Sequence, residues 1–193
     1  MQSHGKAALP VKKNGIFQIS GYFLGRSAII NTRGSLLLSM RPMRRQASRL
    51  PDAEARKILE TGIWGTLATA DSGGQPYAVP LNYALAGDTL YLHSAVEGHK
   101  IENLRENPLI SFSVVASTEV LAERFDMKYC SVTVFGTARF VEDPAEKQSA
   151  LECLMEKYAP AFHDQAMDYI RRNTDRTAVI AIAITGISGK TGQ

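Results

Sequence analysis

Hydrophobic and polar residues between positions 63 and 184 form short runs that are typical of β strands. Apolar residues alternate with polar ones or continue unbroken over roughly four to eight positions, which is the length and pattern of strands. The runs predict strands at residues 63–70, 77–84, 89–94, 109–116, 129–141 and 178–184. Turn signals at 71–74 (DSGG) and 86–88 (AGD) separate the first three strands. We therefore expect these three strands to form an antiparallel meander.

Helical spacing and capping residues predict helices around these strands. One begins at residues 51–54 (PDAE), where proline and acidic residues suit a first turn, and it ends at Gly62. A short helix opens at residues 99–100. In residues 143–146 (DPAE), the aspartate can accept the N3 amide and the glutamate can reach back to the cap. A further helix is predicted at residues 163–173.

Three local expectations follow from the strand runs. Residues 117–127 are acidic and mixed, and we expect them to form a connection. Gly136, inside a long strand, predicts a bulge or a close backbone approach. The unbroken apolar run at 178–184 predicts a strand buried on both faces. The fold class is then mainly β (α+β), a six-stranded antiparallel split β-barrel with flanking helices.

Charge divides the chain near residue 50. Residues 1–50 contain nine Lys and Arg and no acidic residue, whereas the remainder has 13 Lys and Arg against 19 Asp and Glu, a balance of −6. We expect residues 1–42 to be a poorly ordered basic extension and residues 43–193 to form the folded domain. Three interpretations of the extension stay open: a basic arm, a transit-like leader, or non-native residues before a start at Met40 or Met43. The third is favoured.

Composition also bounds the setting and the partners. The mildly acidic folded part argues against a nucleic-acid surface, so no nucleic-acid partner is expected. No apolar run is long enough to cross a bilayer, so no membrane partner is expected. Cys130 and Cys153 have neither CxxC nor zinc spacing, which favours a reducing, cytoplasmic setting and no metal site.

The strongest candidate for chemistry is the corner at residues 91–104, where a strand passes through a small-residue loop into the short helix. Ser94, His99 and Lys100 lie beside the first N–H groups of that helix, and a helix N-terminus favours an anion such as a phosphate monoester. Glu97 opposes an anion unless it points away. The alternative is an ordinary β-turn-α corner with solvated polar residues.

Four motifs together resemble the pyridoxamine 5′-phosphate oxidase-like, FMN-binding split-barrel superfamily, and within it the 5-nitroimidazole-resistance (Nim) branch. They are residues 76–83 (PYAVPLNY), 91–100 (YLHSAVEGHK), 129–139 (YCSVTVFGTAR) and 188–190 (SGK). The resemblance extends from about residue 43 to the C-terminus.

The resemblance implies FMN as cofactor and a homodimer with flavin sites at the subunit interface. The residues that it implies along the flavin ring are Val79, Pro80, Leu81 and Asn82. The residues that it implies at the phosphate are Ser94, His99 and Lys100. It also implies that Ser131 reaches the flavin from the partner subunit. Tyr77 and Asn82 stand where the oxidases themselves carry an Arg and a Lys. This departure argues against true pyridoxamine-phosphate oxidase activity.

His93 corresponds to a histidine that lies near the flavin in Nim-like proteins. The implied catalytic role is to donate a proton or a hydrogen bond to a nitro oxygen. The alternative is a histidine that only satisfies a hydrogen bond at the strand end. Two functions therefore stay open: an FMN-dependent oxidoreductase for small planar, electron-poor substrates such as nitroimidazoles, or a non-catalytic module that binds flavin, haem or deazaflavin.

Overall fold

The structure, a computed structural model, describes residues 11–13, 16–19, 28–30, 36–38 and 41–192. The chain divides into two compact units, Met1–Pro42 and Met43–Gln193. In the first unit the described residues form an antiparallel sheet in the order β1-β2-β3-β4, with β1 at Val11–Lys13, β2 at Ile16–Ile19, β3 at Ala28–Ile30 and β4 at Leu36–Leu38. The expectation of poor order for residues 1–42 falls largely outside the described residues and stays a prediction.

The second unit is built on an antiparallel barrel that closes in the order β10-β7-β6-β5-β8-β9. Its strands are β5 (Trp64–Ala70), β6 (Pro76–Ala86), β7 (Thr89–Ala95), β8 (Leu109–Leu121), β9 (Asp126–Phe140) and β10 (Thr177–Gly192). The six predicted strands and the mainly β fold class are confirmed. Several strands run further than predicted, because their ends are held by pairing with neighbours rather than by apolar side chains.

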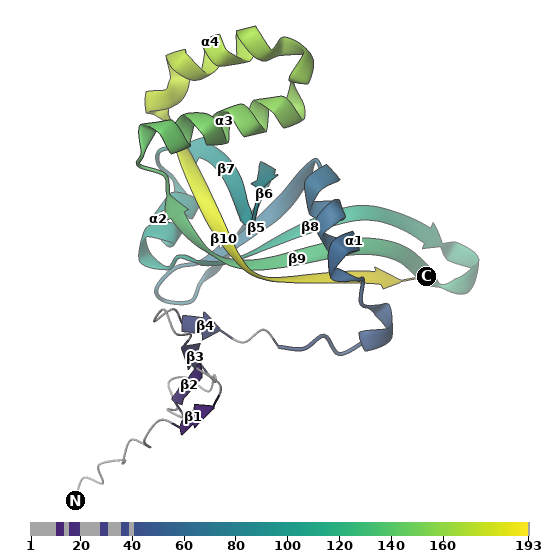
Figure 1. Ribbon diagram of the computed structural model, residues 1–193. Coiled ribbons are helices and arrows are strands. Elements are labelled where there is room, and N and C mark those ends of the chain that lie inside the picture. Colours follow the sequence, from purple (N-terminus) through teal and green to yellow (C-terminus); the bar gives the residue numbers. More distant parts are fainter. Residues whose placement is uncertain (1–10, 14–15, 20–27, 31–35, 39–40, 193) are drawn as a thin grey trace, which may run out of the picture. The chain divides into compact units, whose positions relative to one another are not determined.

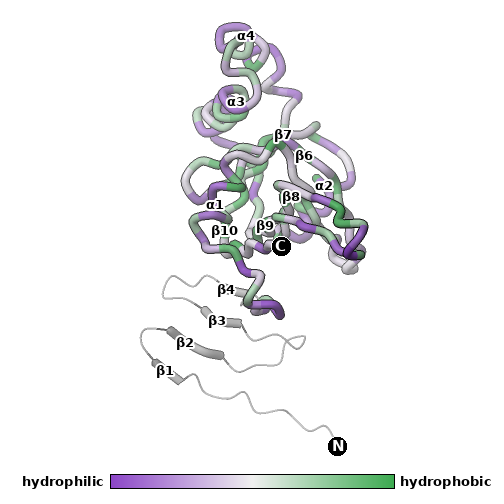
Figure 2. The backbone as a smooth tube through the Cα atoms, turned by 90° about the vertical axis from the view of Figure 1, so that its right-hand side faces the viewer, coloured by the Kyte–Doolittle hydropathy of each residue, from purple (hydrophilic) through white to green (hydrophobic). Residues whose placement is uncertain are grey.

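Four helices surround the barrel: α1 (Asp52–Thr61), α2 (His99–Glu106), α3 (Pro144–Tyr158) and α4 (His163–Asn173). Short 3-10 turns are η1 (Gln46–Ser48), η2 (Ala122–Arg124), η3 (Pro160–Phe162) and η4 (Thr174–Arg176). α3 lies over β6, β7 and β10, and α4 packs on α3, while α1 and α2 lie on other sides of the barrel (Figure 1). Figure 2 shows both polar and apolar residues along α3 and α4, as expected for helices that are buried on one side and exposed on the other.

Two apolar cores follow from the alternation of side chains along each strand. The barrel interior holds Leu67, Leu92, Phe112, Val134 and Ile182, among others. A second cluster joins α3 and α4 to the outer face of the barrel through Val179 and Ala181 of β10. Burial of the last strand on both faces is therefore confirmed for residues 179–182, whereas Ala183 is exposed.

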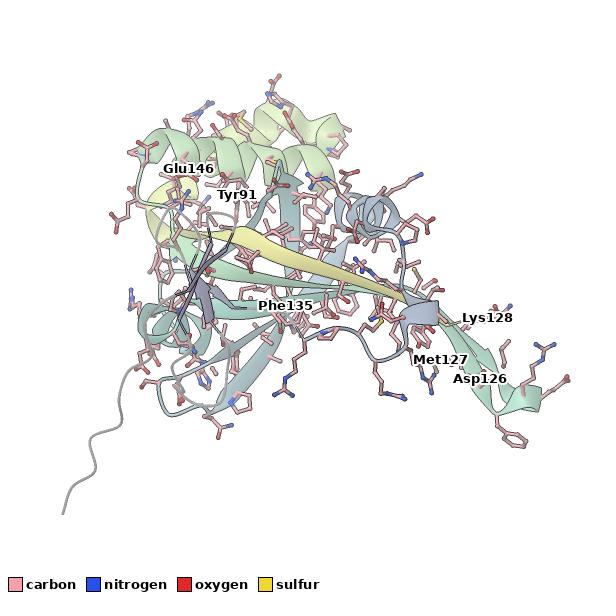
Figure 3. The ribbon with its side chains drawn as sticks, turned by 60° about the horizontal axis from the view of Figure 1, so that its bottom comes forward. Tyr91, Asp126, Met127, Lys128, Phe135 and Glu146 are labelled. Atoms are coloured by element: carbon pink, nitrogen blue, oxygen red, sulfur yellow. The ribbon has the colours of Figure 1, made fainter. Side chains whose placement is uncertain are left out.

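The predicted connection at residues 117–127 is wrong. β8 and β9 continue as a two-stranded arm, paired from Ser117 with Cys130 to Leu121 with Asp126, and joined by η2. Asp126, Met127 and Lys128 lie on this arm beyond the barrel (Figure 3). Pairing across the hairpin, including an ion pair of 3.1 Å between Lys128 Nζ and Glu119 Oε2, outweighs the polar composition that suggested a loop.

Two capping and packing predictions can be checked in detail. Gly136 permits a close approach, since an added Cβ would lie 2.5 Å from Ile182 Cγ2, and the register shifts on the facing strand β10. Asp143 caps α3 by accepting the Glu146 N–H at 2.7 Å. Glu146 binds Arg139 and the Tyr91 hydroxyl instead of reaching back to the cap (Figure 3).

Candidate functional site

The barrel is split between β6 and β7. The two strands pair from Ala86 with Thr89 to Tyr83 with Leu92, and the pairing ends there. Beyond this point β6 stays paired with β5 over residues 76–82, and β7 stays paired with β10. Among the described strands, none pairs with the free edge of β6 at residues 76–82. We call this place, formed by residues 76–82 of β6 and 93–95 of β7, the β6–β7 split.

The four predicted ring contacts on β6 lie at the β6–β7 split but do not share one face. Val79 and Leu81 are half-buried and pack against the barrel core, whereas Pro80 and Asn82 are exposed on the outer face. Alternate residues of a strand point to opposite sides of the sheet. A planar ring lying along all four would therefore meet the free backbone edge of β6, with its N–H and C=O groups.

His93 lies on β7 just past the last β6–β7 pair, opposite Val179 of β10. Part of the side chain is exposed, and burial of the rest lowers the pKa of His93 below its ordinary value. The ring is therefore neutral at pH 7, and its remaining N–H is a hydrogen-bond donor. Within the described residues, no protein hydrogen bond to the His93 ring is found.

The first turn of α2 lies next along the chain. Gly98 precedes it with φ 112°, a conformation that favours glycine, and its carbonyl accepts from Ile101 N at 2.8 Å and Glu102 N at 3.1 Å. The N–H groups of His99 and Lys100 precede these first helical bonds. They therefore point out of the helix beside two basic side chains, as an anion site requires.

Two contacts join α2 to the sheet. The ring of His99 lies against Tyr77 of β6, with centroids 4.2 Å apart and planes inclined by 31°. One helical turn later, Asn103 Nδ2 donates to Thr69 Oγ1 at 3.0 Å, and both residues are buried. The anion site is thereby held against the β6 side of the split. Ser94 is half-buried and its hydroxyl donates to the Ala95 carbonyl at 2.9 Å.

Ser131 lies away from these residues within one chain. It is on β9, where it pairs with Val115 of β8 and Lys190 of β10. In the barrel order β9 stands opposite β6. The structure thus gathers the predicted residues of β6, β7 and α2, and leaves Ser131 on the other side.

Sequence reasoning missed Tyr158 at the end of α3. Between Asn82 and Tyr83, β6 stops pairing with β5 and starts pairing with β7, and we call this place the seam. The Tyr158 side chain closes the seam. Its hydroxyl accepts from Tyr83 N at 3.0 Å and lies 2.5 Å from the carbonyl oxygen of Ile63. Burial raises the pKa of Tyr158, and hydrogen bonds from Tyr83 and Asn82 lower it in part. Nothing in the sequence indicated the partners of its hydroxyl.

In residues 41–192 and the described strands before them, no group of three His, Cys, Asp or Glu is placed to hold a metal ion. Over the same residues no helix has the length and apolar character that a bilayer crossing requires.

The comparisons with known proteins identify the family and the fold. The family model described as pyridoxamine 5′-phosphate oxidase matches residues 51–191. The chain belongs to this family. None of the curated proteins matches the chain.

Two of the similar solved structures are more than a quarter identical to the chain. A candidate 5-nitroimidazole antibiotic resistance protein from Bacteroides thetaiotaomicron is 26% identical, with a TM-score of 0.61, over 74% of this chain and 86% of that one. An FAD-binding protein from Mesorhizobium loti is 29% identical, with a TM-score of 0.54, over 75% and 97%. The FAD and haem binding protein from Mycobacterium smegmatis, 24% identical over 74% and 72% with a TM-score of 0.65, shares the fold. The predicted split barrel and the similarity to a Nim-like protein are confirmed.

Proposed function

We propose that this protein binds FMN at the β6–β7 split and uses it to reduce small planar, electron-poor substrates such as nitroimidazoles and other nitroaromatics. The observation that carries the proposal is that a free strand edge lies next to an anion site. The unpaired β6 edge, the partly exposed His93 ring and the first turn of α2 lie at one place in the fold.

The residues present fit the chemistry of this cofactor. Its pyrimidine ring carries alternating N–H and C=O groups, which suit the donors and acceptors of a strand edge. Its phosphate suits the N–H groups of His99 and Lys100 together with the Lys100 ammonium and the Ser94 hydroxyl. When bound, the flavin supplies hydride transfer.

His93 is the proposed catalytic residue. Its neutral ring can donate a hydrogen bond to a nitro oxygen as negative charge develops there. A hydrogen bond aimed at developing charge stabilises the transition state more than the bound substrate. A proton donated by imidazolium would instead require a pH below the lowered pKa of His93.

We also propose a homodimer with a flavin at each end of the subunit interface. The support is a strip of small residues on the outer face of five paired strands. The side chains of this strip are partly exposed. One row across this strip runs, in register, through Pro80, Thr66, Ser113, Thr133 and Ser188. A face of small, uncharged side chains allows close packing against a copy of itself.

The two flanks of this face carry different parts of the predicted site. Pro80 and Asn82 lie on the β6 flank, and Ser131 lies on the β9 flank beside Lys190. A twofold axis that runs parallel to the strands at the centre of this face would bring the β6 flank of one subunit toward the β9 flank of the other. This arrangement supports the proposed contact of Ser131 with the flavin of the partner subunit.

Two further observations support the proposal as a whole. The resistance protein and the FAD-binding protein share 26% and 29% of their aligned residues with this chain. Both cysteines are free, in keeping with the proposed cytoplasmic location.

The test begins with the visible absorption spectrum of the purified full chain, which is expected to show FMN that is released on denaturation. Under anaerobic conditions, NAD(P)H and a nitroimidazole are then added. Loss of the nitro absorbance is expected in the wild type and in His163→Ala, a matched control at the exposed start of α4. His93→Ala is expected to slow it about 10²-fold or more.

Two outcomes contradict the proposal. A colourless protein that FMN does not reconstitute removes the cofactor assignment. Bound flavin that is inert toward every nitroaromatic and reductant tried indicates instead a binding or storage module.

A further inference from the structure

Tyr77 contributes an aromatic ring to the first turn of α2 although it belongs to a different element. Its ring stacks on His99 at 4.2 Å between centroids with a tilt of 31°. The contact joins the second residue of β6, near the β5–β6 turn, to the first residue of the helix. Tyr77 is half-buried, whereas His99 is exposed, so the tyrosine is the fixed member of the pair.

The position of Tyr77 is set by the same network that anchors α2. Tyr77 pairs in register with Thr69 of β5, and the Thr69 hydroxyl receives the hydrogen bond from Asn103. His99 and Asn103 are four residues apart and therefore lie on one face of α2. The paired sheet residues Tyr77 and Thr69 thus contact His99 and Asn103, respectively, on one face of the helix.

An exposed histidine at the start of a helix is free to rotate about its side-chain bonds unless a neighbour packs against it. Stacking on Tyr77 limits the imidazole to one side of the helix start, beside the outward N–H groups of His99 and Lys100.

We propose that Tyr77 is a positioning residue for phosphate recognition, which acts by holding the His99 imidazole at the anion site of α2. The inference rests on the proposed function and extends it: Tyr77 sets the preference for a phosphorylated flavin over one without phosphate. Riboflavin shares the ring of FMN and lacks the phosphate, so the ratio of the two affinities measures this role.

The experiment measures dissociation constants for FMN and riboflavin by fluorescence quenching with the full-length apoprotein. Wild type is expected to prefer FMN. In Tyr77→Leu the preference is expected to fall about threefold to tenfold, with riboflavin affinity unchanged, because a stacked aromatic pair contributes on that scale. Tyr77→Phe keeps the ring and is expected to keep the preference.

A double-mutant cycle separates positioning from general damage. If Tyr77 acts through His99, Tyr77→Leu has no further effect on the preference once His99→Ala is present. An unchanged preference in Tyr77→Leu, or fully additive effects in the double variant, overturns the inference. Failure of the proposed function looks different, since wild type then binds neither flavin or shows no preference. Circular dichroism of each variant checks that the fold is retained.

Discussion

The hydroxyl of Tyr158 is expected to contribute more to stability than any surface hydrogen bond of the barrel, and Tyr158→Phe tests this. The substitution keeps the ring and removes the oxygen that accepts from Tyr83 N and lies beside the Ile63 carbonyl. Tyr83 is 0% exposed, so water does not replace the lost partner of its N–H. The backbone of Ile63 belongs to a residue that is 67% exposed and is expected to find water.

The magnitude follows from the buried donor. A buried N–H left without a partner costs about 1–3 kcal/mol. We therefore expect the free energy of unfolding to fall by about 2 kcal/mol. For a folded unit of this size the midpoint of thermal unfolding then falls by roughly 4–8 °C.

The assay is urea unfolding of the full chain, followed by circular dichroism and by tryptophan fluorescence. The matched control is Tyr91→Phe, because the Tyr91 hydroxyl binds the Glu146 carboxylate, which keeps its ion pair with Arg139. We expect the control to lose about 0.5 kcal/mol or less. A Tyr158→Phe variant as stable as the control would refute the assignment of Tyr158 as the closure of the seam.

Three further predictions concern packing and ionisation. Gly136→Ala is expected to cost about 3 kcal/mol in urea unfolding, because its Cβ meets the facing strand at 2.5 Å. Gly87→Ala, with open space but φ of 55°, is expected to cost about 1 kcal/mol; the reverse order would contradict the packing. Burial lowers the pKa of Lys157, so the folded protein binds fewer protons than the unfolded chain as pH approaches 10.5, and stability rises with pH in that window. Urea unfolding at several pH values is expected to show a smaller rise of stability with pH in Lys157→Met than in the wild type, and an unchanged rise in the exposed control Lys128→Met. Equal slopes in all three proteins would contradict the prediction. Because the pKa of His93 lies below 6.5, nitroimidazole reduction is expected to be constant between about pH 7 and 8, and a steady fall across that range would contradict a neutral donor.

Local patterns predicted the elements well because their causes are local. The alternation of apolar residues, the DSGG turn and the Asp143 cap each act within a few positions. For the same reason helix α4 begins and ends where its spacing indicated. The predicted chemistry at Ser94, His99 and Lys100 likewise came from neighbours in sequence.

Apart from the two-stranded arm at residues 117–127, the sequence by itself determined the positions of the barrel strands, the helices, the family resemblance and the basic corner that opens α2. Only the tertiary structure decided where β6 leaves β7, that Tyr77 stacks on His99, and that Tyr158 closes the seam. The reason is physical: strand pairing and side-chain stacking join residues far apart in the chain. Their register depends on the packing of the whole barrel, which no local window of sequence contains.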